Sequence, residues 1–331
     1  MVPSRSIGTV AAMSGVFTRI LAAIDGSEPS NVAVTVAARL ASEHGAQLVL
    51  CHCANWEPLI VQLQSIGAIV DPTPTIGAVK ERGTRVLAEA AGRAHEFGVE
   101  VRSVVLQGDP PTGISALARE TQSGLIVMGT HDGAGMQRLL VGSTTSAVLQ
   151  RSTLPVLTVR PGIRVAPPVR RCFERILVAT DDSALSAVAI ETALAFPAED
   201  RRELLFCSVA DVDRVSAESD REDPLAGSRL AAQAQTAVER ALERARARGI
   251  AAQGRVLEGN PGAELVAAAE RERVDLIVLG THGRHGGERI ALGSVAERII
   301  RTAPLPVMIV GSGVRSRDDA AASANHQASL V

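Results

Sequence analysis

The chain contains one long segment twice. The residues RILAAIDGS at 19–27 return as RILVATDDS at 175–183, which is an offset of 156 positions. Farther along, LIVMGTH at 125–131 returns as LIVLGTH at 276–282, at an offset of 151. The second copy has therefore lost five residues between these two points. A repeat of this length predicts two copies of one domain in tandem.

Apolar and amphipathic stretches follow one another in the same order in both copies. Short apolar runs without polar alternation, such as LIVMG at 125–129, predict strands that are covered on both faces. Alanine-rich amphipathic stretches between them predict helices, and Gly45 and Gly249 are typical of the position just past a helix. The order predicts an α/β fold of two tandem doubly wound domains. Each is expected to hold a five-stranded parallel sheet with ligands at the carboxyl ends of its strands.

Composition along the chain indicates where the domains begin and end. We expect a first domain at 17–160, a Pro-rich charged linker at 161–172 and a second domain at 173–311. Residues 312–331 are small and polar, so we expect a disordered tail there. Met13 stands just before the first predicted strand and is an alternative start to Met1.

Charge and cysteine content argue against several classes of protein. The formal net charge is −2 at pH 7, so we expect neither a nucleic acid nor a membrane as partner. Four cysteines in 331 residues are not a disulfide framework. Cys51 and Cys53 face one side of a predicted strand and His52 the other, which favours packing over a metal site. No secretory signal is evident, and we expect a cytoplasmic protein.

The stretch GTHGRHGGERIALGS at 280–294 lies between a predicted strand and a predicted helix. Glycines let a phosphate approach the backbone, and a helix start offers free N–H groups and a positive dipole end. The alternative is a tight strand-to-helix connection without a ligand. Neither GxxxxGK[ST] nor a GxGxxG after a first strand is present, so the common phosphate motifs do not explain the stretch.

The spacing G-x2-G-x9-G-S, formed by Gly280, Gly283, Gly293 and Ser294, resembles the ATP-binding signature of the universal stress protein family. The aspartate that ends each first strand and the closing sequences LPVLTV and LPVMIV resemble this family too. The resemblance covers 17–160 and 173–311. It implies Rossmann-like domains, similar to adenine nucleotide α-hydrolases, that pair through their last strands as an intramolecular pseudo-dimer.

The resemblance, together with the position of residues at strand ends and in the glycine-containing loop, predicts a set of site residues. In the second copy these nucleotide-binding residues are Thr180, Asp181, Val209, Gly280, Gly283, Arg284, Gly293, Ser294 and Val295. In the first copy the corresponding residues are Asp25, Cys53, Gly129, Gly133, Gly142, Ser143 and Thr144.

The loops of the two copies differ at the second glycine of the signature. The first copy reads GTHDGAGMQRLLVGS at 129–143, so Asp132 stands where the second copy has Gly283. Two like charges about 4 Å apart at an effective dielectric near 20 repel by about 4 kcal/mol, so Asp132 should oppose a phosphate. We therefore expect the second copy to bind the nucleotide. A one-residue shift that uses Gly133 keeps the first copy as an alternative.

These features predict an ATP-binding protein, with or without Mg²⁺, that acts in stress response as a nucleotide-dependent regulator or adaptor. One alternative is a nucleotide-free scaffold for protein interaction, and a further one is a slow ATPase. No convincing set of catalytic residues or metal ligands is present in the sequence. A protein partner and a homodimer beyond the internal pairing are both left open by the sequence.

Overall fold

A computed structural model describes residues 17–57, 61, 65, 71, 73–130, 141–163, 172–196, 202–211, 225–283 and 292–311. The elements of the first copy are β1 (Arg19–Ala23), α1 (Glu28–His44), β2 (Gln47–Ala54), α3 (Thr73–His95), β3 (Val101–Gln107), α4 (Pro110–Glu120), β4 (Leu125–Gly129), α5 (Ser143–Arg151) and β5 (Val156–Val159). Those of the second copy are β6 (Arg175–Ala179), α6 (Ala184–Leu194), β7 (Glu203–Ala210), α8 (Ala226–Ala247), β8 (Ala252–Glu258), α9 (Pro261–Arg271), β9 (Leu276–Gly280), α10 (Ser294–Thr302) and β10 (Val307–Val310).

The repeat predicted from the sequence is present in the structure. Ala54 and Ala210 end the second strand of each copy at an offset of 156, and Val101 and Ala252 begin the third strand at an offset of 151. The five residues missing from the second copy are therefore lost between the second and third strands. The strand ends themselves are unaffected, so the carboxyl edges of the two copies can be compared position by position.

Helix starts and stops follow from local sequence. Ser27 and Ser183 cap α1 and α6, each accepting a hydrogen bond from a backbone N–H three residues ahead. Gly45 ends α1 with φ of 58°, and its N–H donates to the last carbonyls of the helix. This left-handed conformation suits a glycine, which confirms the predicted helix end.

The strands of the described residues form one sheet in the order β3-β2-β1-β4-β5-β10-β9-β6-β7-β8. Neighbours within each copy are parallel, whereas β5 and β10 pair antiparallel, with Leu157 opposite Met308. The Thr158 hydroxyl adds a 2.9 Å hydrogen bond to the Val307 carbonyl across this junction. The two copies thus pair through their last strands, as the resemblance implied.

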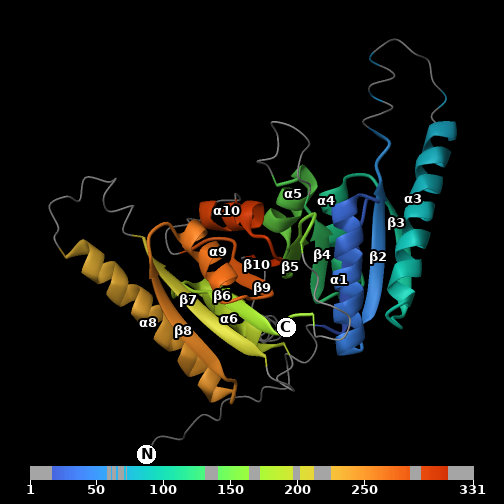
Figure 1. Cartoon of the computed structure of the whole chain (residues 1–331). Helices are drawn as coiled ribbons and strands as arrows, with labels where there is room; N and C mark the ends of the chain where they lie inside the picture. Colours follow the sequence, from blue (N-terminus) through green and yellow to red (C-terminus); the bar gives the residue numbers. More distant parts are fainter. Residues whose placement is uncertain are drawn as a thin grey trace, which may run out of the picture.

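Helices cover both faces of this sheet, and each face has a core that continues from one copy into the other. One core contains residues of α1, α3, α6 and α8, and the other contains residues of α4, α5, α9 and α10. In Figure 1, α3 and α8 lie at the two outer ends of the molecule, beside the edge strands β3 and β8. None of the described helices is long and apolar enough to cross a membrane.

An aromatic cluster joins the copies on the face covered by α1 and α6. The ring of Phe17 lies 4.6 Å from that of Phe196 and stacks on His44 at 4.9 Å, while Phe173 meets Phe196 edge-on at 6.3 Å. Phe17 and Phe173 occupy the same position in the two copies.

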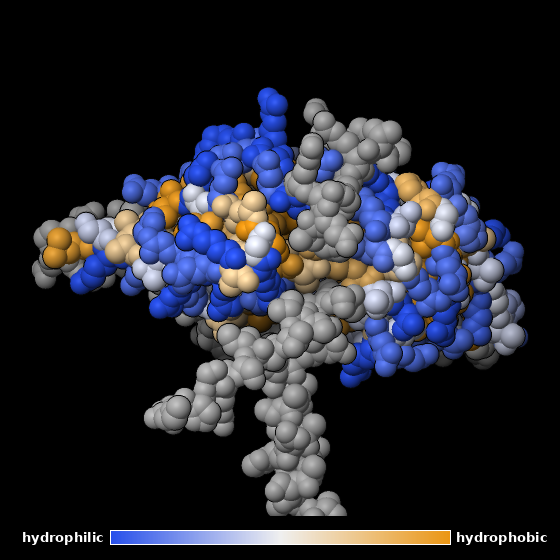
Figure 2. Space-filling view, turned by 90° about the horizontal axis from the view of Figure 1, so that it is seen from below, coloured by the Kyte–Doolittle hydropathy of each residue, from blue (hydrophilic) through white to orange (hydrophobic). Residues whose placement is uncertain are grey.

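In the coloured part of Figure 2, the outer surface is mostly hydrophilic and a band of apolar residues crosses its middle.

Charged groups accompany this aromatic cluster. Arg202 is buried, lies 4.9 Å from the centre of the Phe196 ring and pairs with Glu43 of α1 at 3.6 Å. The Glu43 carboxylate also accepts a hydrogen bond from the backbone N–H of Cys172. Cys172 is the last residue of the predicted linker, and it is buried. Polar and apolar contacts therefore both hold the copies together.

Candidate nucleotide site

The carboxyl end of β6 carries the first group of predicted site residues. Thr180 is buried; its N–H donates to the Cys207 carbonyl at 2.9 Å, and its hydroxyl lies 3.5 Å from that of Ser186. The next residue, Asp181, accepts the backbone N–H of Ser183 at 3.0 Å through Oδ1. Asp181 therefore lies at the carboxyl edge of the sheet in a turn held by this hydrogen bond. Its second carboxylate oxygen, Oδ2, takes no part in that bond.

The structure brings Asp181 together with a glycine of the β9–α10 connection. A Cβ added to Gly283 would lie 2.5 Å from Asp181 Oδ2. The carboxylate thus lies against the bare Cα of Gly283, and residues more than 100 positions apart share one spot at the sheet edge. Both are predicted site residues, but the contact between them has no signal in the sequence. Any side chain at position 283 would displace the Asp181 carboxylate.

The other two glycines of the signature are required by packing. A Cβ on Gly280 would meet Leu185 of α6, with the Cβ of Leu185 only 2.8 Å away. A Cβ on Gly293 would lie 2.7 Å from the Thr281 carbonyl, which also accepts the Gly293 N–H at 2.9 Å. Gly280 lets α6 approach the end of β9, and Gly293 lets the chain before α10 pack against Thr281. Packing within the protein therefore explains these two glycines as well as close approach to a ligand would.

The start of α10 presents backbone donors at the same edge. Gly293 is its N-cap, with φ of −65° and ψ of 148°, and no side chain of the described residues caps this helix. By contrast, Ser183 and Asn260 cap α6 and α9 with their side chains. Ser294 is exposed and Val295 half-buried at the first two helical positions. The first N–H groups of α10 and its dipole can therefore act on an anion.

Val209 and Arg284 are the remaining predicted site residues of the second copy. Val209 lies near the end of β7, opposite Leu257 of β8, and is half-buried against the core beside α9 and α10. Arg284 lies outside the described residues. His282 follows the strand end, with Nδ1 3.2 Å from the Thr281 hydroxyl.

The first copy has the same framework with a more exposed carboxylate. Asp25 is exposed, whereas Asp181 is half-buried; Asp25 Oδ1 accepts the N–H of Ser27 at 2.9 Å. Gly129 has the same packing role as Gly280, because a Cβ there would lie 2.7 Å from backbone atoms of α1. Gly142 caps α5 without a side-chain hydrogen bond, just as Gly293 caps α10. Both copies thus share a tightly packed strand-end glycine and a helix start that no side chain of the described residues caps.

The remaining first-copy predictions are only partly described. Cys53 lies near the end of β2, half-buried, with its thiol 4.0 Å from the Pro110 carbonyl. Ser143 and Thr144 are the first two residues of α5. Gly133 and the neighbouring Asp132 lie outside the described residues.

One interaction at the site gave no signal in the sequence. Asp182, which follows Asp181, adopts φ of 64° and pairs with Arg240 of α8. The equivalent first-copy residue is Gly26, with φ of 85°. A left-handed conformation is uncommon for a non-glycine residue, so the ion pair helps to hold the loop that carries Asp181. Only the tertiary fold brings α8 to this loop.

The cysteines are packed thiols in the structure. Burial raises the pKa of the Cys207 thiol to about 12, and burial together with Asp109 raises the pKa of Cys53 to about 11. His52 points to the opposite side of β2 from the cysteines, and its Nδ1 lies 2.9 Å from the Ile24 carbonyl. The described residues hold no cluster of three metal-ligating side chains.

Comparison with known proteins adds a second line of evidence. The model of the universal stress protein family matches residues 17–160 and 173–311. A universal stress protein of Bacillus subtilis is 34% identical over 148 residues, covering 44% of this chain and 99% of its own length. One of Mycolicibacterium smegmatis is 26% identical over 301 residues, covering 88% of this chain and 96% of its own.

A similar fold is found among solved structures. The crystal structure of a universal stress protein from Archaeoglobus fulgidus superposes with a TM-score of 0.67 and covers 90% of this chain and 98% of its own. Its sequence identity is 23%, so this likeness concerns the fold alone.

Proposed function

The chain belongs to the universal stress protein family, and from this premise we propose that its second copy binds ATP and that occupancy of this site regulates the protein. The observation that carries the proposal is the contact between Asp181 and Gly283 near the start of α10, which no side chain of the described residues caps. A carboxylate that can accept ribose hydroxyls thus stands next to backbone groups that can donate to phosphates.

The residues fit the two ends of an adenine nucleotide. The N–H groups at Ser294 and Val295, together with the helix dipole, would hold the phosphates. The Asp181 carboxylate would meet the adenosine, and Val209 would supply apolar surface to the adenine. Arg284 would add a positive charge to the phosphates. Charge-assisted hydrogen bonds of about 1.5–3 kcal/mol each would make a few such contacts sufficient for micromolar binding.

Regulation is proposed because the sequence carries no convincing set of catalytic residues. ATP would shift the protein between conformations, or change its choice of protein partner, to the extent that it binds one state more tightly. We propose domains at 17–160 and 173–311 as the units of this response, joined by the linker at 161–172. The first copy would bind nucleotide more weakly, because Asp132 replaces the second glycine of the signature.

A nucleotide-free scaffold is the second candidate, and one observation favours it. Gly280 and Gly293 are both needed for packing, so the signature could persist without a ligand. On this account the paired copies would only present surfaces to another protein.

Calorimetric titration with ATP decides between the two, using Asp181→Asn and the matched first-copy variant Asp25→Asn. The proposal expects saturable binding to the native chain, weakened roughly tenfold or more by Asp181→Asn and little by Asp25→Asn. Titrations with ADP, AMP and cyclic AMP identify which phosphates contribute. The absence of heat with every nucleotide, in protein shown by mass spectrometry to carry none, would favour the scaffold.

A further inference from the structure

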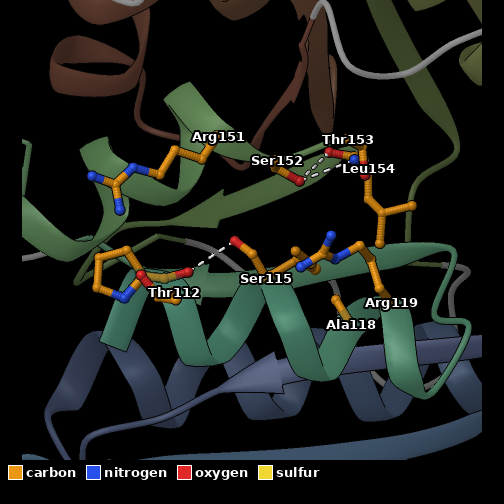
Figure 3. Close-up of a pocket in the computed structure, with 10 residues that line it drawn as sticks. Thr112, Ser115, Ala118, Arg119, Arg151, Ser152, Thr153 and Leu154 are labelled. Carbon is orange, nitrogen blue, oxygen red and sulfur yellow. Dashed lines mark hydrogen bonds between the residues drawn. The ribbon is translucent and has the colours of Figure 1, made fainter. Parts of the chain in front are cut away.

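A groove lined by none of the predicted nucleotide-binding residues lies on the first copy, between α4 and the segment that leads from α5 into β5. Ala118 and Ile126 line its floor but are 1% exposed, so its accessible apolar surface comes mainly from half-buried Leu154. Ser115, whose hydroxyl donates to the Pro111 carbonyl at 2.8 Å, and Thr153 also line it. Figure 3 shows Ser115 and Arg119 of α4 on one side and Arg151 to Leu154 on the other. Its volume is about 230 Å³. Sites for drug-sized ligands enclose about 300–1,000 Å³, so this groove suits a smaller molecule.

Two arginines give the groove a positive charge. In Figure 3 the Arg151 side chain extends toward the end of the groove near Thr112, while Arg119 extends from the other end toward Ser115. No carboxylate of the described residues pairs with Arg119. Arg151 is 3.9 Å from Asp109, a loose pair with side chains 58% and 60% exposed. Such an exposed pair is weak, so a ligand can compete for Arg151.

The Asp109 carboxylate at the rim is engaged by its own helix. Its Oδ2 accepts the Thr112 N–H at 3.2 Å and the Thr112 hydroxyl at 2.6 Å. These bonds and Arg151 lower the pKa of Asp109. The carboxylate is therefore ionised near neutral pH and caps α4. Its single negative charge offsets only one of the two arginines that line the groove.

The second copy serves as an internal control for what the fold itself requires. At an offset of 151, Arg119 corresponds to Glu270 and Arg151 to Thr302. The hydroxyl groups are absent as well, because Val266 stands in place of Ser115 and Pro304 in place of Thr153. Since both copies fold alike, neither the cations nor the hydroxyls are needed for α4 and α9 to pack.

Packing at the equivalent place in the second copy is also closer. A Cβ added to Gly262 at the start of α9 would lie 2.7 Å from Arg298 Cδ, so the Arg298 side chain lies across this helix. The corresponding first-copy residues are Pro111 and Ala147. The alanine side chain ends at Cβ, so it cannot extend over α4 as Arg298 extends over α9. The positive groove is therefore a feature of the first copy.

We propose that this groove binds a small organic dianion, an aliphatic dicarboxylate, with one carboxylate on Arg119 and the other on Arg151. Arginine presents several donors in a planar fork that matches a carboxylate. The carbon chain would lie on Leu154, and the exposed Thr153 would contribute a hydrogen bond through its hydroxyl. This site is independent of the nucleotide proposal.

Calorimetry with the dicarboxylates from succinate to suberate, and with hexanoate as a monoacid, tests the assignment at constant ionic strength. We expect a preferred chain length that binds at least tenfold more tightly than hexanoate. The variant Arg119→Glu, which introduces the second-copy residue, should weaken it at least tenfold. Arg85→Gln, an exposed arginine of α3 paired with Glu81, is the matched control and should change nothing.

Three results would overturn the proposal. The first is equal binding by the native chain and Arg119→Glu, and the second is no saturable heat with any dicarboxylate. The third is saturable binding of a hexaglutamate peptide with none of the dicarboxylates, which would make the groove a protein-docking surface. Unfolding midpoints of both variants within experimental error of the native chain show that the comparison concerns binding alone.

Discussion

A methyl group added at Gly283 should weaken nucleotide binding without unfolding the protein. The Cβ of Gly283→Ala would lie 2.5 Å from Asp181 Oδ2, so this oxygen must move by about 1 Å to reach ordinary contact. The obstacle is the end of a half-buried side chain, and the loss of stability should stay within about 0.5 kcal/mol. A displaced carboxylate loses a charged hydrogen bond of about 1.5–3 kcal/mol, which is roughly a ten- to hundredfold loss of affinity.

Gly280→Ala is the matched variant with the opposite expectation. Its Cβ would lie 2.8 Å from the Cβ of Leu185 and 3.3 Å from the backbone carbon of Leu185, so α6 must shift. Such overpacking costs about 1–3 kcal/mol. Urea unfolding and ATP titration of both variants give the two quantities separately. The reasoning is refuted if Gly283→Ala binds ATP like the native chain, or if it loses as much stability as Gly280→Ala.

Three further predictions concern packing and ionisation. Gly129→Ala should destabilise the chain by about 1–3 kcal/mol in urea unfolding, since its Cβ would lie 2.7 Å from the backbone of Pro29 and Ser30; an unchanged midpoint would contradict the packing role. Phe196→Ala should cost about 3–5 kcal/mol, because the ring is 3% exposed and contacts both copies. The pKa of the Cys207 thiol is raised from 9.0 to about 12 by burial, so its contribution to stability is complete below pH 9 and is lost as the pH rises toward 12; unfolding of Cys207→Ala should show a weaker loss across this range.

Much of the fold could be predicted because the chain contains two copies of one domain that can be compared with each other. The repeat established the number of copies, and unalternating apolar runs identified strands buried on both faces. The antiparallel pairing of β5 with β10 followed from the family resemblance alone. Apolar runs such as LPVMIV are the same whether a last strand pairs with another copy or ends the sheet.

The details of the site depended on contacts that no local pattern encodes. Gly280 ends β9 and Gly283 follows three residues later, yet a Cβ on the first would meet Leu185 and a Cβ on the second would meet Asp181. Only the tertiary structure brings Asp181 and the start of α6 to these glycines and so reveals their different roles. The ion pair of Asp182 with Arg240 likewise joins a loop to a distant helix, and the sequence offers no spacing that would reveal it.

The most direct test of the central claim is the amount of nucleotide released when freshly purified protein is denatured, measured beside Gly283→Asp. This variant gives the second copy the aspartate that the first copy has at the equivalent position, 132. It also brings a second carboxylate close to that of Asp181. One ATP per chain, absent from the variant, is the result that the account predicts. Two per chain would contradict the difference between the copies. No nucleotide on release and no binding on titration would contradict the nucleotide site itself.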